Sequence, residues 1–170
     1  MLNLIVFIII FLIFATGAYA GFEGAPWVPT SRKNVKRFLK LANVRKGEVV
    51  YDLGCGDGRV VFAAAEKGAV ARGLEISLFP FIFAWFSRFF KKDKERIKIS
   101  YKSIWKTDLS DADVIYFFLL PVAYPRMKKK LENELKKGAR IVVCAWPIEG
   151  WETAVTDKKE GELGMYLYVN

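Results

Sequence analysis

Three alternating glycines stand where an apolar strand is expected to give way to a helix. The run "VVYDL" is followed by Gly54, Gly56 and Gly58, and then by the helical pattern "RVVFAAAEKG". Glycine lets the backbone turn sharply and lets a ligand approach the main chain closely. The N-terminus of the helix behind the turn favours a negative group such as a carboxylate or a phosphate. The segment therefore predicts a ligand site.

The spacing of this turn separates two classes of nucleotide ligand. A dinucleotide fingerprint requires G-x-G-x-x-G, whereas here the third glycine comes one residue early and is followed by Arg59. Two acidic residues of the turn, Asp52 and Asp57, would repel a pyrophosphate. They suit a ligand that carries an ammonium, a carboxylate and a sulfonium. The turn therefore favours S-adenosylmethionine over NAD.

A further acidic residue, Glu75, stands at the end of the next expected strand, "AVARGLE". A carboxylate there can accept hydrogen bonds from both ribose hydroxyls, a contact that NAD and S-adenosylmethionine both need. The alternative is that Glu75 caps the helix that follows. We expect its removal to cost little stability, because an acid at the mouth of a site supports no core packing.

The composition excludes several kinds of chemistry. The chain contains no histidine, which removes histidine metal sites and Ser-His or Cys-His catalysis. Its two cysteines, Cys55 and Cys144, lack C-x-x-C spacing and are expected to be packed residues in a reducing compartment. We expect no metal. The formal net charge of +9 is typical of proteins with a nucleic acid or an anionic membrane as partner.

Strand and helix patterns alternate along most of the chain. A first helix, which Thr30 or Ser31 can cap, ends before Gly47. Strands are then expected over 48–53, 69–75, 96–101, 113–121 and 139–147, with helices over 59–68, 76–94 and 124–138. The tail 151–169 fits two further strands. This order predicts an α/β fold: a Rossmann-like, mostly parallel seven-stranded sheet with helices on both faces and an antiparallel C-terminal hairpin.

The first twenty residues contain no charged side chain. Residues 2–20 would extend over roughly 28 Å as a helix, about one bilayer core. A cleaved secretory signal is the alternative, since residues 18–20 read Ala-Tyr-Ala. No basic residue precedes this run, and several follow it: Arg32, Lys33, Lys36, Arg37, Lys40, Arg45 and Lys46. The positive-inside rule then predicts an uncleaved transmembrane anchor over 1–20, a linker over 21–31 and a cytoplasmic domain over 32–170.

A second apolar segment, "SLFPFIFAWFSRFF" (77–90), is too short to span a bilayer and includes Arg88. Packing of this helix against the sheet is one interpretation. Partial insertion at a membrane interface is the other.

Residues 22–170 resemble the seven-strand, S-adenosylmethionine-dependent methyltransferases, on the glycine turn followed by "GLE" at a strand end. More narrowly, the chain is similar to the small membrane-anchored protein lysine methyltransferases of mitochondria and their prokaryotic relatives. The segments that carry this likeness are "PWVPTS", "SIWK", "FFLLP" and "CAWPIEGW". Mitochondrial members act on lysines of the ATP synthase c subunit and of the adenine nucleotide translocase.

The resemblance implies a role at each matching position. The methionine end of the cofactor would be held by Asp52, Gly54 and Gly56, and the ribose by Glu75. Two residues, Ser103 and Ile104, would lie beside the adenine. Relatives often carry an acidic residue in place of this serine. A serine hydroxyl accepts a hydrogen bond from the adenine amino group more weakly than a carboxylate does. The lid on the N-terminal side would be formed by Thr30 and Ser31.

Aromatic residues at the ends of the fourth and fifth strands suit a lysine substrate. We expect Tyr116, Pro121 and Trp146 on the substrate side, and Phe117 and Phe118 in the core. An aromatic, apolar pocket favours the neutral amine and also tolerates the methylated cation. No residue is identified as a catalytic base.

The expected function is S-adenosylmethionine-dependent methylation of lysine side chains in a membrane or membrane-associated protein. Nucleic acid is not expected as a partner, because the basic surplus lies beside the membrane segment. Two alternatives stay open. One is a methyltransferase for a membrane-borne small molecule, such as a quinone or a lipid head group. The other is a non-catalytic module that binds S-adenosylmethionine.

Overall fold

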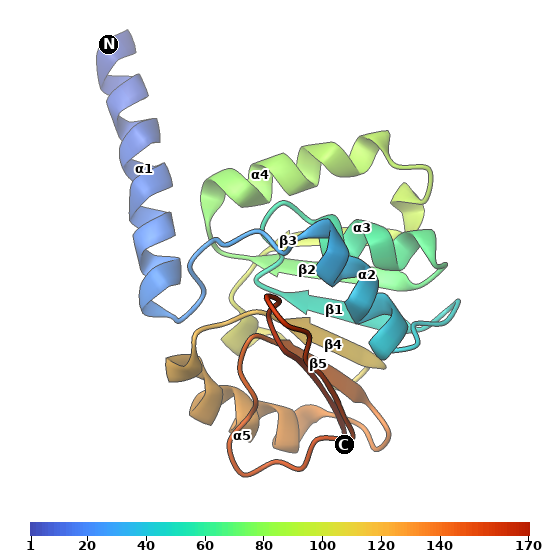
Figure 1. The fold of residues 1–170 in the computed structure, drawn as a ribbon. Helices are drawn as coiled ribbons and strands as arrows, with labels where there is room; N and C mark the ends of the chain where they lie inside the picture. Colours follow the sequence, from blue (N-terminus) through green and yellow to red (C-terminus); the bar gives the residue numbers. More distant parts are fainter.

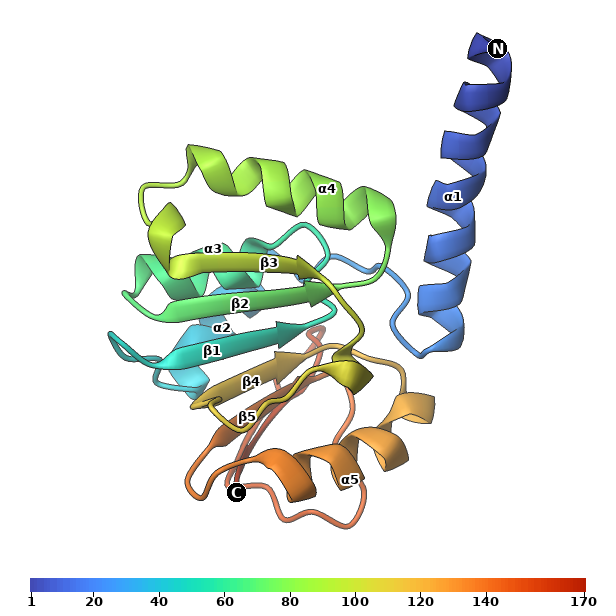
Figure 2. The same cartoon turned by 180° about the vertical axis from the view of Figure 1, so that it is seen from behind.

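A computed structural model describes residues 1–170 as one seven-stranded sheet flanked by helices, with an N-terminal helix standing at its side (Figures 1 and 2). The strand order is β3-β2-β1-β4-β5-β7-β6. The strands are β1 (Val49–Leu53), β2 (Val70–Glu75), β3 (Ile97–Tyr101), β4 (Val114–Phe117), β5 (Arg140–Cys144), β6 (Val155–Asp157) and β7 (Met165–Val169). The expected Rossmann-like sheet is confirmed.

The first five strands are parallel, so their carboxyl ends meet at one edge of the sheet. β1 lies in the middle and pairs with β2 and β4, with Asp52 opposite Gly73 on one side and Tyr116 on the other. β7 runs antiparallel to β5 and β6, which gives the expected C-terminal hairpin. In an open sheet of this kind, ligands bind beyond the carboxyl ends where the order of the strands reverses. That point lies between β1 and β4.

Two hydrophobic layers cover the sheet, because successive side chains of a buried strand point to opposite faces. One layer packs under α2 (Arg32–Leu41), α3 (Arg59–Glu66) and α4 (Leu78–Ser87). The other packs under α5 (Tyr124–Glu134), which buries Met127 and Leu131. Neighbouring β4 residues divide between them, since Tyr116 enters the first layer and Phe117 the second.

Several elements end earlier than the sequence patterns predict. The helix expected over 76–94 stops at Ser87 and continues as the short 3₁₀ turns η1 (Arg88–Phe90) and η2 (Lys94–Arg96), because the chain must reverse to bring Ile97 to the sheet edge. Likewise, the strand expected over 113–121 ends at Phe117, before the short 3₁₀ turn η4 (Pro121–Ala123).

The fifth strand and the helix before it also differ from the expected bounds. The strand expected over 139–147 ends at Cys144, because Ala145 adopts a left-handed backbone conformation with φ +79°. The helix expected over 124–138 ends at Glu134, where Leu135 turns to an extended conformation.

The N-terminal helix α1 (Leu2–Phe22) is long and apolar enough to cross a membrane, with a mean hydropathy of 2.5. It runs two residues past the boundary expected at position 20. Only its last turns meet the domain, through a side that includes Ile13, Thr16 and the fully buried Ala20. The amide of Leu78, at the start of α4, donates to Thr16 Oγ1 at 3.1 Å.

Arg37 of α2, one of the basic residues that follow the apolar N-terminal run, is buried. Its guanidinium donates to Asp157 Oδ2 at 2.8 Å and to the Leu163 carbonyl oxygen at 2.9 Å. It also lies 3.1 Å from Glu162. These contacts fasten α2 to the C-terminal hairpin.

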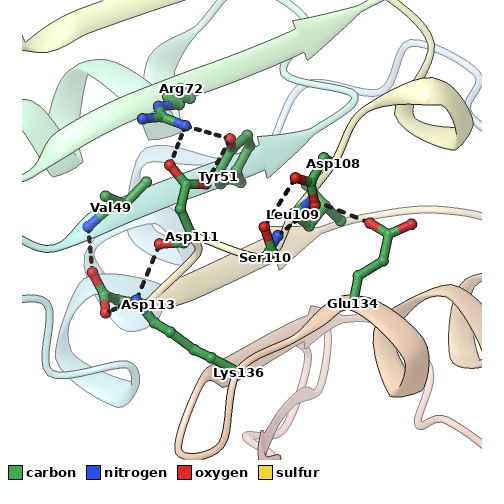
Figure 3. Close-up of polar contacts among 10 residues, drawn as sticks. All are labelled: Val49, Tyr51, Arg72, Asp108, Leu109, Ser110, Asp111, Asp113, Glu134 and Lys136. Carbon is green, nitrogen blue, oxygen red and sulfur yellow. Dashed lines mark hydrogen bonds and ion pairs between the residues drawn. The ribbon is translucent and has the colours of Figure 1, made fainter.

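Charged side chains meet in pairs near the amino ends of the strands (Figure 3). Asp111 accepts from the Tyr51 hydroxyl at 3.0 Å and pairs with Arg72 at 2.6 Å. Asp113 accepts from the Val49 amide at 2.7 Å and pairs with Lys136 at 2.6 Å, as Figure 3 also shows. These bonds tie the loop before β4 to β1 and β2.

Candidate functional site

The glycine turn lies between β1 and α3, at the carboxyl edge of the sheet. Gly58 is the residue that precedes α3, with φ +81°. Gly56 has φ +52°, and a Cβ atom at this position would lie 2.7 Å from the indole nitrogen of Trp27. Because that separation is shorter than any real contact, only glycine fits between the turn and the segment that crosses it. The turn therefore forms a close-packed cradle of main chain.

Asp52 is the last but one residue of β1, and only 3% of it is exposed. No side chain or backbone group of the protein donates a hydrogen bond to its carboxylate or pairs with it. Burial raises the pKa of Asp52 well above its ordinary value, and the negative charges of Glu75 and Asp57 raise it further. A buried carboxylate without a partner costs free energy, and a cationic ligand would remove that cost.

Glu75 ends β2 and is also buried. One carboxylate oxygen accepts from the Gly56 amide at 2.8 Å. The other accepts from the amides of Ile76 and Ser77 at 2.9 and 2.8 Å. The contact with Ser77, the residue before α4, is the helix-capping role that the sequence left as an alternative. A carboxylate has about four acceptor positions, so three bonds leave room for one more donor.

A cavity of about 460 Å³, including its solvent-open mouth, lies over the turn. Three parts of the chain line it: residues 25–30, the turn together with Glu75, and the aromatic wall that Tyr116 and Phe118 form with Leu119 at the end of β4. The predicted cofactor residues that line it are Thr30, Asp52, Gly54, Gly56, Asp57 and Glu75.

A second cavity of about 280 Å³ adjoins the first. Gly54 and Glu75 line both, and Ser103 and Ile104 line only the second. Ser103 precedes the short 3₁₀ turn η3 (Ile104–Lys106), and its hydroxyl accepts from the Trp105 amide at 3.3 Å. The glutamate thus stands between the two compartments, as a ribose would between methionine and adenine.

Two predicted cofactor residues have other partners. Ser31 lies outside the first cavity and caps α2, with its hydroxyl accepting from the Asn34 amide at 3.1 Å. Asp57 lines the cavity but forms an ion pair with Arg59. The same guanidinium donates to the Thr30 carbonyl oxygen at 2.8 Å. The Asp57–Arg59 pair therefore holds the segment that contains Thr30 to the glycine turn.

The substrate-side residues are divided by the fold. The hydroxyls of Tyr116 and Thr30 lie 3.1 Å apart, at the cavity wall. Phe118, which was expected in the core with Phe117, lines the cavity instead. Its ring lies 6.2 Å from that of Trp146, which is 40% exposed and lines neither cavity.

Pro121 does not line either of these cavities and begins η4. No group of three or more histidine, cysteine, aspartate or glutamate side chains is arranged to hold a metal ion.

Comparison with known proteins identifies the family. A profile of the ANTKMT methyltransferase domain matches residues 52–155, which include the glycine turn, Glu75, Ser103 and the aromatic wall. This chain belongs to that family.

Relatives of this ANTKMT-type methyltransferase come from archaea and animals. A protein-lysine N-methyltransferase of Saccharolobus islandicus is 36% identical over 85% of this chain and 92% of its own length. The ATP synthase c-subunit lysine N-methyltransferase of Homo sapiens is 35% identical over 74% of this chain. The match spans only 54% of the human protein, so this chain corresponds to about half of that relative.

A solved structure described as an RNA methyltransferase from Salinibacter ruber, in complex with S-adenosyl-L-homocysteine, superposes with a TM-score of 0.80. It is 30% identical to this chain, and the match covers 84% of this chain and 93% of that one. S-adenosylhomocysteine is what S-adenosylmethionine becomes once its methyl group has left. The cofactor of this methyltransferase is accordingly S-adenosylmethionine.

The residues of the site fit this cofactor. Asp52 supplies a buried carboxylate that lacks a cationic partner, and the cofactor carries both an ammonium and a sulfonium. The turn at Gly56 has no space for a side chain, as close approach to main chain requires. Glu75 presents one free acceptor position between the two cavities. The assignment of each residue to one part of the cofactor remains a proposal.

Sequence reasoning assigned no role to Trp27 or Arg59 and put Phe118 in the core, whereas all three line the first cavity. The tryptophan covers Gly56, and the signal that could have identified it is its place between Pro26 and Pro29, in a segment too stiff to be a free linker. Arg59 had a local signal, since an arginine two residues after Asp57 can reach its carboxylate.

Proposed function

We propose that this protein is a lysine N-methyltransferase that is anchored in a membrane by α1 and acts on a membrane or membrane-associated protein. The names of the relatives from Saccharolobus islandicus and Homo sapiens support a protein lysine as acceptor. The observation that carries the proposal is the aromatic, uncharged wall at the end of β4, which adjoins the carboxylate-lined part of the cavity. An amine can approach along that wall.

The cofactor supplies a methyl group that a positively charged sulfur makes electrophilic. The protein must present the amine in its neutral form, which is only about one in a thousand at neutral pH for a lysine with a pKa of ~10.4. Phe118 and the ring of Trp146 exclude water from the approach and favour the neutral amine. Their faces also accommodate the methylated cation.

Tyr116 is the polar group nearest to this approach. Its hydroxyl is bonded to Thr30, and burial raises its pKa well above the ordinary value, with the neighbouring Cys144 adding to the effect. The phenol therefore stays protonated at neutral pH and cannot remove a proton from the substrate. It can accept a hydrogen bond from the amine and orient it, so its role is positioning.

The membrane anchor is supported by α1, which carries no charged side chain. Six exposed basic residues follow it, namely Arg32, Lys33, Lys36, Lys40, Arg45 and Lys46. The positive-inside rule then puts the catalytic domain on the cytoplasmic side, with α1 uncleaved.

RNA is the second candidate acceptor, because the name of the Salinibacter ruber structure includes it. A specific feature favours it: a groove between α2 and α3 is lined by five lysines and arginines besides Arg59, namely Arg32, Lys36, Lys40, Lys67 and Lys91. A quinone or a lipid head group is the third class of acceptor to be tested.

The test is transfer of a radioactive methyl group from labelled S-adenosylmethionine by the full chain to membranes of its own organism. Digestion by protease, digestion by ribonuclease and solvent extraction are compared. We expect the label to be released by protease and to appear as methylated lysine after acid hydrolysis. Release by ribonuclease or by solvent would refute the proposal in favour of RNA or of a small molecule.

A variant of Trp146 tests the substrate side of this proposal. Trp146→Ala should raise KM for the acceptor about tenfold, as expected when a ring is removed that contributes about 1–2 kcal/mol of contact. Cofactor affinity should not change, because this residue does not line the cofactor cavities. An equal loss of cofactor affinity would place the tryptophan in the core of the site.

A further inference from the structure

Helix α4 has an exposed face made of large apolar side chains. Within α4 and η1 these are Phe79, Ile82, Phe83, Trp85, Phe86, Phe89 and Phe90, each between 42% and 75% exposed. Only Pro80 and Ala84 of α4 are buried. Contiguous apolar surface of this kind marks an interaction site.

The relation between α4 and α1 indicates what covers this face. Figures 1 and 2 view the molecule from opposite sides, and in both α1 stands upright at the side of the domain while α4 runs crosswise above the sheet, with one end toward α1. The sheet lies beneath α4, and the first turns of α1 rise beyond it. The outer face of α4 is therefore turned toward the side to which the N-terminus of α1 extends.

The contact between α4 and α1 fixes the level along α1 at which α4 lies. The bond from Leu78 to Thr16 joins the start of α4 to a residue six positions before the end of α1 at Phe22, which is about 9 Å along the helix axis. All 21 residues of α1 cover about 31 Å, close to the ~30 Å of a hydrocarbon core. Because the last turns of α1 pack against the domain, the part of α1 that is free to lie in a bilayer ends near Thr16, at the level where α4 begins.

We infer that α4 lies in the membrane interface, with its apolar face among the acyl chains, so that the catalytic domain is seated on the bilayer as well as tethered to it. This inference rests on the membrane anchoring in the proposed function. Interfacial helices bury their apolar face by about 5–10 Å, and the bond to Thr16 puts the start of α4 at the level where α1 leaves the domain.

Charge at the end of the segment supports a bilayer as the occupant. Residues 78–90 contain no acidic side chain, and Arg88 is their only charged residue. The next six residues carry four basic side chains, Lys91, Lys92, Lys94 and Arg96, against the acidic Asp93 and Glu95, which leaves a basic surplus. Basic residues beside an apolar face favour a surface with anionic head groups.

Trp85 makes the inference measurable. The full chain is reconstituted in vesicles of phosphatidylcholine and phosphatidylglycerol that contain lipids brominated either near the head group or near the bilayer centre. The chain has five tryptophans, so the signal of Trp85 is the difference between the native protein and Trp85→Phe. We expect shallow bromine to remove about half of that signal or more, and deep bromine to remove less.

Trp146 is the matched control. It is 40% exposed, against 42% for Trp85, and it follows β5, on the other half of the sheet. Its signal, obtained in the same way with Trp146→Phe, should change little with either lipid. Equal quenching of both tryptophans would overturn the inference, because it would reflect general contact of the domain with lipid.

A charged variant tests the face itself. Phe83→Glu with Phe86→Glu should abolish the shallow quenching of Trp85, whereas Val155→Glu, on the exposed edge strand β6, should not. In detergent, the double variant should keep the native thermal midpoint and cofactor affinity. A lower midpoint, or a native chain that is dimeric in detergent while the variant is monomeric, would show that the face packs against protein and would overturn the inference.

Alkaline carbonate extraction separates this inference from the proposed anchor. If the chain stays in the membrane and Trp85 is not quenched, α1 spans the bilayer but α4 does not enter the interface. If carbonate releases the chain, the anchor itself fails, and the seating of α4 fails with it.

Discussion

Acidic side chains at the two ends of the sheet are in opposite electrostatic situations. Near the amino ends, Asp113 has both a lysine and a backbone amide as partners. These bonds hold the pKa of Asp113 below its ordinary value, although burial alone would raise that pKa. At the carboxyl edge, Asp52 is buried without a partner, and its pKa is raised. Charge that the fold satisfies itself is structural, whereas charge that it leaves unsatisfied is available to a ligand.

Glu75 lies between these two situations, and its removal should have the largest effect. The sequence predicts little loss of stability, but the structure contradicts this, because Glu75→Ala leaves three backbone amides without an acceptor. We therefore expect a loss of about 2 kcal/mol or more in unfolding free energy. Cofactor affinity should also fall by at least about tenfold. Thermal unfolding without ligand and calorimetry with S-adenosylmethionine measure the two effects. Native stability would show that the three bonds contribute little.

Asp52→Asn should separate the contribution of this carboxylate to cofactor binding from its contribution to stability. Cofactor affinity should fall by roughly ten- to hundred-fold, the value of a charge-assisted bond of about 1.5–3 kcal/mol. The thermal midpoint without ligand should not fall, because no bond within the protein is lost and a buried charge is removed. The matched change Asp113→Asn should leave cofactor affinity unchanged. An Asp52 variant with native affinity would contradict the assignment of the cofactor's cation to this residue.

The pH dependence of cofactor binding should follow from the raised pKa of Asp52. Below that pKa the carboxyl is neutral, so affinity for a cationic ligand should rise with pH by up to about tenfold per unit and then level off. Stability of the free protein should change in the opposite direction, because ionising a buried acid with a raised pKa opposes folding.

The measurement is calorimetry between pH 4 and 7, below the ~7.7–8.0 at which an α-amino group loses its charge. The chain has no histidine that titrates in this range. Asp52→Asn should flatten the profile, and a slope that persists in this variant would identify another group.

Asp113→Asn should have the smallest effect. The amide can still accept from Val49, but the ionic contact with Lys136 is lost, so we expect a loss of about 1 kcal/mol at neutral pH. A carboxylate with a lowered pKa stabilises the fold above the unfolded value of ~3.9. This stabilisation is lost as the pH falls below ~3.9 and through the lowered pKa of the folded protein, so the difference between native protein and variant should vanish there. Denaturant unfolding at several pH values checks this, and a constant difference would point to packing.

The sequence predicts the alternation of strands and helices and the cofactor turn well, because both depend on local patterns. The alternation of strands and helices leads to the parallel sheet, and the register of Gly54, Gly56 and Gly58 after Asp52 leads to the ligand. What surrounds the turn depends on contacts between distant segments. No local pattern states that Trp27 comes to lie over Gly56, or that the carboxylate of Glu75 reaches the Gly56 amide.

Single residues at the ends of elements are also hard to predict. Ser31 fits a lid residue and a helix cap equally well in sequence, and its side chain caps α2. Phe117 and Phe118 are chemically the same, but they point in opposite directions where β4 ends, so one enters the core and the other the cavity. The rotation of the chain at that point decides between them.

Residues 23–31 connect α1 to the domain, and they are held rather than loose. The Gly24 carbonyl oxygen accepts from the Leu120 amide at 2.7 Å, and Thr30 is bound by both Arg59 and Tyr116. With α1 anchored as proposed, the catalytic edge of the sheet is therefore held in a fixed position relative to the membrane. It works at one height above the bilayer, and an acceptor lysine must be presented at that height. The height of a lysine above the membrane would then help to select the substrate. It would act together with the sequence around the lysine and would partly replace it.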